Sequence, residues 1–208
     1  MAKAFVPLLI ATAAAACISC VSSCASSAGD ENESIFPDSI ELRAGDLAFR
    51  CGGSLDSRAV MIADHGGNFS HVGIVVDNNG TKMIVHAVPD EPEFEGDVDR
   101  VKMETPQKFF IRKNAIYGQI SRHPDSVVAR KAGEIALGVY NRSTLFDSEF
   151  NLADTTKMYC TELILYSFDR AGDPLHIKPR HKAQWMDHQS VMPSDIIETD
   201  KFQKIYSF

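Results

Sequence analysis

Residues 70–88 read SHVGIVVDNNGTKMIVHAV, two β-prone segments separated by a run of turn-forming residues. Segments 71–76 and 82–88 are rich in valine and isoleucine, which favour strands. The DNNG between them, residues 77–80, is typical of a tight hairpin turn. This stretch therefore predicts an antiparallel β-hairpin around which the rest of the fold is organised.

The predicted hairpin carries one histidine on each strand, His71 and His86. If residues 77–80 form the turn, the two histidines lie directly opposite each other. If residues 79–80 alone form the loop, His86 faces Gly73, and His71 lies on the same side. Either register predicts neighbouring imidazoles, one able to act as a base while the other fixes its tautomer. A pair of half-exposed structural histidines is the alternative.

The remaining elements are predicted from apolar spacing and from turn and capping residues. We expect strands near residues 45–50, 98–101 and 115–120, an acidic loop over 89–96, and helices over 54–64, 124–140 and 159–168. Thr155 or Thr156 is expected to cap the last helix and Gly172 to end it. These elements predict an α+β fold, in which a small antiparallel sheet carries the histidine strands and packs against the helices.

The composition is that of an ordinary globular protein. The chain has 208 residues, of which 44% are hydrophobic, and this is enough for one sizeable core. Its net charge of −7, without a long Lys/Arg run, argues against nucleic acid as a partner. We expect no cofactor.

The N-terminal segment has the pattern of an export signal: Lys3 precedes an apolar run from residue 4 to 21. The VSSC of residues 21–24 resembles the lipoprotein box of bacteria, in which the cysteine receives lipid. We therefore expect a signal peptide over 1–23, lipidation at Cys24, a polar tether over 24–36 and one domain over 37–208. This predicts an exported lipoprotein of the bacterial cell envelope. The alternative is an ordinary secretory signal with incidental cysteines.

Removal of residues 1–23 leaves Cys51 and Cys160 as the cysteines of the domain. Cys160 is expected at the first turn of an apolar helix, where free N–H groups and the helix dipole favour a thiolate and could hold an oxyanion. The alternatives are a buried cysteine that acts as an apolar residue, or a disulfide with Cys51 that would silence the thiol.

Three quoted strings carry a resemblance to a known family: SHVGIVV at 70–76, IVHA at 84–87 and YCTELI at 159–164. They look like the circularly permuted members of the NlpC-type papain-like cysteine hydrolases, the YiiX/YaeF-like group. The expected order is also kept by GDL at 45–47, LFDSEF at 145–150 and MPSDI at 192–196. The resemblance spans about residues 42–200 and implies a permuted papain-like fold.

The resemblance implies a catalytic triad, with Cys160 as nucleophile, His71 as general base and His86 as the orienting third member. Many permuted members have glutamate where His86 stands, and Thr161 replaces the usual serine. Tyr159, Thr161 and Ser70 are candidates for oxyanion or substrate contacts. The implied reaction is cleavage of an amide bond in a small peptide or amino-acid conjugate, such as a cell-wall peptide, through a thioester.

Other functions remain open. Related folds act on acyl chains, so an acylated lipid is a competing substrate. His71, His86 and Cys160 could instead hold zinc, or the chain could be a surface binding lipoprotein with a relic triad. His181 and His188, near Trp185, are expected in a polar surface segment rather than in a metal site.

Overall fold

The computed structural model describes residues 30–182 and 187–208. The predicted signal peptide, Cys24, most of the tether and Trp185 lie outside these ranges. Residues at the end of the predicted tether already contact the domain: Ser34 forms a β-bridge with Ile111, and Phe36 is buried. In the described ranges, no helix combines the length and the apolar character needed to cross a bilayer.

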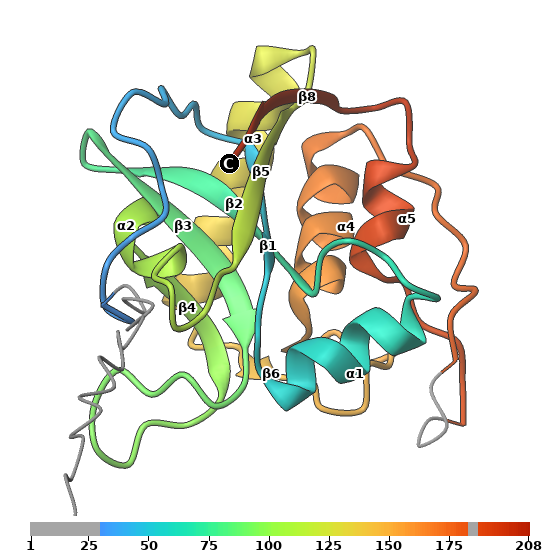
Figure 1. The fold of residues 1–208 in the computed structure, drawn as a ribbon. Helices are drawn as coiled ribbons and strands as arrows, with labels where there is room; N and C mark the ends of the chain where they lie inside the picture. Colours follow the sequence, from blue (N-terminus) through green and yellow to red (C-terminus); the bar gives the residue numbers. More distant parts are fainter. Residues whose placement is uncertain (1–29, 183–186) are drawn as a thin grey trace, which may run out of the picture.

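Eight strands of the described residues form one sheet in the order β7-β6-β4-β3-β2-β1-β5-β8 (Figure 1). Neighbouring strands are antiparallel except for the parallel pair β6–β7. The predicted α+β class is confirmed, but the sheet is larger than expected because short strands extend both edges. The strands are β1 (Leu47–Cys51), β2 (His71–Asn78), β3 (Thr81–Val88), β4 (Arg100–Glu104), β5 (Tyr117–Arg122), β6 (Leu145–Phe146), β7 (Lys157–Met158) and β8 (Gln203–Ser207).

The helices of the described residues are α1 (Leu55–Ala63), α2 (Pro106–Phe109), α3 (Ser126–Asn141), α4 (Cys160–Ala171) and α5 (Pro193–Ile197). Asp125 caps α3 by accepting from the N–H groups of Val127 and Val128. Gly172 ends α4 at φ 100°, as predicted. The predicted threonine cap is wrong: residues 157–158 form β7, so α4 begins after Tyr159, which makes no side-chain cap.

The hairpin adopts the register with the two-residue loop. Asn78 pairs with Thr81, and Asn79 and Gly80 have φ values of 53° and 86°, the conformation of a type I′ turn. The ladder between β2 and β3 stops at the pair Ile74–Val85, although both strands continue beyond it. The two strands therefore lose their pairing at the end that carries the histidines.

The two faces of the central strands pack against different partners. One face, here called the α4 face, contacts α3 and α4 through Val72, Ile74, Val85 and Leu163, among others. The other, the α2 face, contacts α2 and its neighbours through Ala48, Val75, Ile84, Phe109 and Phe110. Because side chains alternate along a strand, the α2 face also carries both histidines.

Candidate catalytic site

The two hairpin histidines contact each other. His71 Nε2 lies 2.9 Å from His86 Nδ1, and the ring centroids are 5.1 Å apart. His86 faces Gly73, where a Cβ would lie 2.6 Å from a methyl of Ile84 and 3.2 Å from the Cβ of His86. Only glycine leaves that space open. Both histidines are buried, so the alternative of a half-exposed pair is wrong.

Glu104 lies behind His86 on the neighbouring strand β4. Its Oε2 is 3.4 Å from His86 Nε2, and both atoms are buried without another partner among the described residues. Lys108 Nζ lies 2.7 Å from the other carboxylate oxygen. Burial by itself raises the pKa of Glu104, but the contacts with His86 and Lys108 outweigh it and lower the pKa to about 2. Glu104 is therefore an anion facing the imidazole of His86.

Arg50 on β1 pairs with His71 across the sheet and is buried. Its guanidinium lies 4.5 Å from the ring centre of Phe109, donates to the Phe109 carbonyl at 2.8 Å and forms an ion pair with Glu91. Burial, the charge of Arg50 and the neighbouring His86 together hold the pKa of His71 well below 6.5. His71 is therefore neutral, and available as a base, at neutral pH.

Cys160 is the first residue of α4, as predicted, and its thiol is free and 8% exposed. Cys51, the last residue of β1, is a second free thiol, so no disulfide joins these two described cysteines. The backbone N–H groups of Val72, Thr161 and Cys160 lie near the sulfur and by themselves lower the pKa of Cys160. Burial outweighs these contacts and raises the pKa of Cys160 to about 11. The expected resting thiolate is therefore wrong, because desolvation exceeds the effect of the helix start.

The thiol and the histidine pair approach the same point from opposite faces of the sheet. Cys160 belongs to the apolar core of the α4 face, whereas His71 and His86 lie on the α2 face beside Phe109. The faces meet where the β2–β3 ladder ends, since the Cys160 sulfur lies near the backbone N–H of Val72, the residue directly after His71. In the described part of the chain, no hydrogen bond joins the sulfur to the His71 ring.

The three candidate contact residues use their hydroxyl groups on the backbone. Tyr159 Oη accepts from the N–H of Val191 at 3.2 Å, and Thr161 Oγ1 donates to the carbonyl of the same residue at 2.7 Å. Ser70 Oγ accepts from Gly52 N–H at 2.9 Å. These bonds hold the start of α4 and the start of β2 in place, and a direct role in binding substrate stays a prediction.

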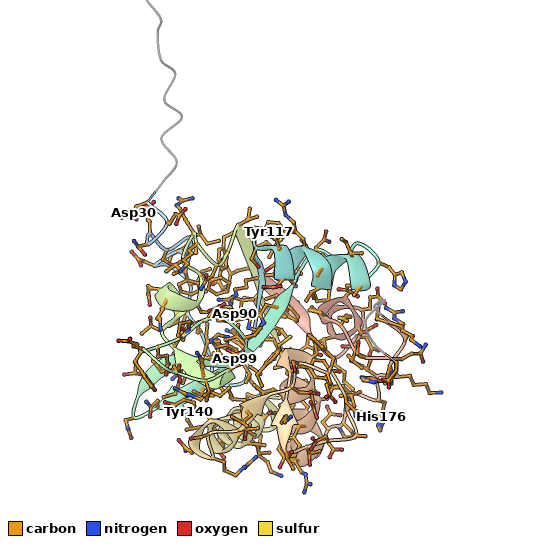
Figure 2. All side chains as sticks on the ribbon, turned by 90° about the horizontal axis from the view of Figure 1, so that it is seen from below. Asp30, Asp90, Asp99, Tyr117, Tyr140 and His176 are labelled. Carbon is orange, nitrogen blue, oxygen red and sulfur yellow. The ribbon has the colours of Figure 1, made fainter. Side chains whose placement is uncertain are left out.

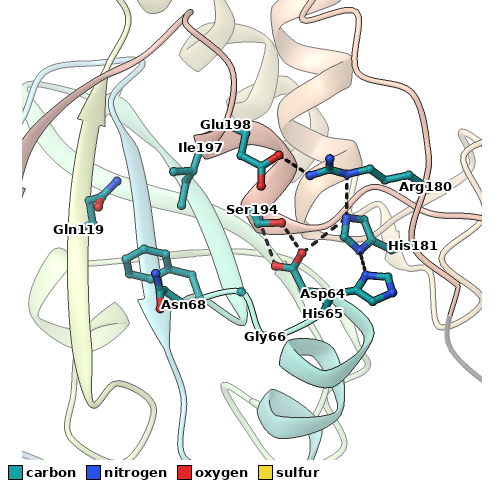
Figure 3. A pocket seen from close by; sticks show the side chains of 12 residues that line it. Asp64, His65, Gly66, Asn68, Gln119, Arg180, His181, Ser194, Ile197 and Glu198 are labelled. Atoms are coloured by element: carbon teal, nitrogen blue, oxygen red, sulfur yellow. Dashed lines mark hydrogen bonds and ion pairs between the residues drawn. The ribbon is translucent and has the colours of Figure 1, made fainter.

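His181 is buried, so its predicted place in a surface segment is wrong. Its Nε2 lies 3.0 Å from Asp195. The same atom lies 3.6 Å from Asp64, and Nδ1 lies 3.1 Å from the ring of His65 (Figure 3). The cluster lines a cavity of about 600 Å³ between α1, β5 and α5. His188 is partly exposed and contacts Asp187, as expected for a surface segment.

The described residues contain no group of three or more His, Cys, Asp or Glu side chains arranged to hold a metal ion. The His181 cluster is therefore not such a group, and neither is the zinc ligand set considered from the sequence, His71, His86 and Cys160. In the described structure, the rings of His71 and His86 are hydrogen-bonded to each other rather than pointed at a common centre.

The structure adds Glu104 and Arg50 to the residues found from the sequence. Glu104 lies on the opposite side of β4 from Val101 and Met103. A sequence prediction that extended this strand to residue 104 would therefore have placed Glu104 on the histidine face. Arg50 was included in the first predicted strand, but its buried side chain had no local signal. Its partners Glu91 and Phe109 lie 41 and 59 residues away in the chain.

Neither a protein-family model nor a curated protein sequence matches the chain. A search of solved structures finds a similar fold in the crystal structure of metalloprotein YiiX from Escherichia coli O157:H7. The TM-score is 0.63, and the match covers 80% of this chain and 98% of that chain at 16% identity. At this identity the likeness extends to the fold alone: the chain has a YiiX-like α+β fold.

Proposed function

We propose that the chain is a thiol-dependent hydrolase in which Cys160 is the nucleophile, His71 the general base and His86 the residue that orients it. The observation that carries this proposal is that the Cys160 sulfur lies near the backbone N–H of Val72. Val72 directly follows His71, whose ring is held by His86. The fold likeness to YiiX and the order of the sequence motifs agree with a permuted papain-like hydrolase.

The carboxylate of Glu104 supports a definite proton arrangement. An anionic Glu104 favours a proton on His86 Nε2, which leaves Nδ1 of that ring to accept from His71 Nε2–H. The proton-free nitrogen of His71 is then Nδ1, for which the described residues provide no hydrogen-bond donor. Glu104 and His86 thus select the tautomer in which His71 can remove a proton.

The proposed reaction starts from a neutral thiol and a neutral imidazole. His71 takes the Cys160 proton as the sulfur attacks the substrate carbonyl carbon, and the N–H groups at the start of α4 stabilise the oxyanion. His71 then gives the proton to the leaving amine, the C–N bond breaks and a thioester remains. Water, deprotonated by His71, hydrolyses the thioester and restores the thiol.

The substrate class has two candidates, an amide in a small peptide or amino-acid conjugate and the acyl bond of a lipid. Motif resemblance favours the first. The predicted export signal and lipidation sequence make the second relevant, and the same triad would serve both.

YiiX is described as a metalloprotein. In this chain, the described residues contain no group of three or more His, Cys, Asp or Glu side chains that could hold a metal ion. We also propose that Cys24 is lipidated and anchors the domain to the membrane.

Incubation of the protein with purified muropeptides and, separately, with acylated lipids tests the function by mass spectrometry of the products. Cys160→Ala is expected to lower turnover by about a thousandfold or more, because it removes the nucleophile. Cys51→Ala, the other free thiol, is the matched control and should keep activity. Turnover that survives Cys160→Ala would show that another group is the nucleophile. Binding of these compounds without turnover by the wild type would indicate a binding protein instead of a hydrolase.

A further inference from the structure

Helix α1 leaves two large apolar side chains uncovered, with the exposed Arg58 between them on the same side of the helix. Leu55 and Ile62 are 81% and 77% exposed, the highest values among the large apolar side chains of the described residues. They are seven residues apart, so they lie on the same side of the helix. On the inner side Ala63 is buried, and Met61 contacts Cys51 through their sulfur atoms at 3.6 Å. The helix thus covers the end of β1 with one face and presents the other to solvent.

The uncovered surface continues from α1 to the start of β5. Ile116 is 62% exposed, and its side chain lies next to Gly53, two residues before α1. Tyr117 follows and donates to the carbonyl of Asn68 in the loop that leaves α1. We call Leu55, Ile62, Ile116 and Tyr117 the α1 patch. Leu55, Ile62 and Ile116 are more than 60% exposed, whereas Tyr117 is partly covered by Phe69, whose ring centre lies 5.6 Å from its own.

The described part of the chain begins on the segment that leads to Ile116 of the α1 patch. Lys113 N–H donates to Glu31 O at 2.9 Å, and Arg112 N–H donates to Glu33 O at 2.9 Å, three to four residues before Ile116. Figure 2 shows Asp30, Tyr117 and helix α1 along the same edge of the molecule. The segment that precedes Asp30 contains the apolar run of residues 4–21 and Cys24.

We propose that the α1 patch docks on the surface of a lipid bilayer. The inference rests on the proposed membrane anchoring of the N-terminal segment. Cys24 precedes Asp30 by only six residues, a stretch that spans at most about 20 Å when extended. A lipid on Cys24, or a retained apolar segment, would therefore hold this edge of the domain close to the membrane. Shallow insertion of exposed leucine, isoleucine and tyrosine side chains suits the boundary between head groups and acyl chains.

The charge of the chain favours an apolar contact over an electrostatic one. A net charge of −7 gives no general attraction to anionic lipids, so zwitterionic phosphatidylcholine should suffice. Docking would turn the start of α1 toward the lipid. Gly52, just before α1, is bonded to Ser70, which precedes His71, so the contact would lie close to the histidine pair.

The test uses the full chain in phosphatidylcholine vesicles that contain a doxyl-labelled phosphatidylcholine, which quenches tryptophan at the membrane. Ile62→Trp places a probe in the α1 patch. Val127→Trp is the matched control, since Val127 is 64% exposed. It lies at the start of α3, after the end of β5 that is opposite Tyr117. Trp185 is common to both variants, and the unmodified chain gives its contribution. Flotation with the vesicles measures anchoring separately.

Docking predicts about twofold or more extra quenching for Ile62→Trp, none for Val127→Trp, and equal flotation of both variants. Adding Leu55→Ser to Ile62→Trp should reduce the quenching. Equal quenching at the two positions with flotation retained would overturn docking while leaving the anchor and the hydrolase intact. Absence of flotation, or shielding of the Ile62→Trp probe that depends on protein concentration rather than on lipid, would overturn it as well, the latter in favour of contact between two copies.

Discussion

The two faces of the central sheet bury their side chains in different ways. On the α4 face, Val72, Ile74 and Val85 meet apolar side chains of α3 and α4. On the α2 face, strands β1, β3 and β4 bury the polar side chains of Arg50, His86, Lys102 and Glu104. His86 and Arg50 pack against Phe109. The first face depends on apolar area removed from water, and the second on each buried charge having a partner.

This difference locates the proposed chemistry. The thiol of Cys160 lies in an environment that disfavours its anion, while burial and the neighbouring charge of Arg50 keep His71 neutral. The faces meet only where the β2–β3 ladder ends. A nucleophile and a base from unlike environments can therefore approach each other without either face losing its packing.

Removing one charge from the α2 face should cause the largest loss of stability. Lys102 and Asp97 are both 1% exposed in their side chains and lie 3.0 Å apart. Lys102→Met removes a buried cation and its bond to the Glu91 carbonyl, while Asp97 keeps Arg100 as a partner. We expect a loss of about 2–3 kcal/mol in chemical denaturation. Lys82→Met, which breaks the exposed pair with Asp77, should have a much smaller effect. Similar losses for the two variants would contradict the importance of buried charge pairs.

Glu162 breaks the pattern on the helix side of the sheet. It is buried on α4, and neither carboxylate oxygen has a good hydrogen bond among the described residues. Burial, assisted by Asp147 and Asp154 and opposed by the Tyr159 N–H, raises its pKa to about 8. The folded state therefore favours the protonated acid, so its contribution to stability is complete below about pH 4.5 and is lost as the pH rises through 8.

Glu162→Gln mimics the protonated acid at every pH. The variant and the wild type should have similar unfolding free energies at pH 5, and the variant should be more stable by about 1–3 kcal/mol at pH 9. Urea denaturation at the two pH values measures this. A difference that stays constant with pH would show that Glu162 does not titrate in the way its burial implies.

Glu104→Gln should have a smaller effect and should act on the thiol rather than on the fold. Loss of the anion behind His86 weakens the selection of the reactive His71 tautomer. We expect alkylation of Cys160 by iodoacetamide to slow about threefold at pH 7, less than after loss of His71 itself. Glu134→Gln, on an exposed ion pair of α3, is the control and should leave the rate unchanged. An unchanged rate in Glu104→Gln would remove this carboxylate from the proposed site.

Local patterns predict the elements of this fold, but not the partners of its buried charges. The turn residues and β-branched runs predict the hairpin, and the spacing around Cys160 places it at a helix start. The pairings of Arg50 with Glu91 and of His86 with Glu104 depend on contacts between distant segments. The pKa of Cys160 was predicted in the wrong direction for the same reason, since the helix start is local whereas burial comes from the whole core.

The central claim is that His71 activates Cys160 across the end of the β2–β3 ladder. The most direct test compares the iodoacetamide reaction rates of Cys160 and Cys51 at pH 7, in the wild type and in His71→Ala, by mass spectrometry of the labelled peptides. We expect His71→Ala to slow alkylation of Cys160 about tenfold and to leave Cys51 unaffected. Cys160 reacting at the same rate with and without His71, in a variant that remains folded, would contradict the account.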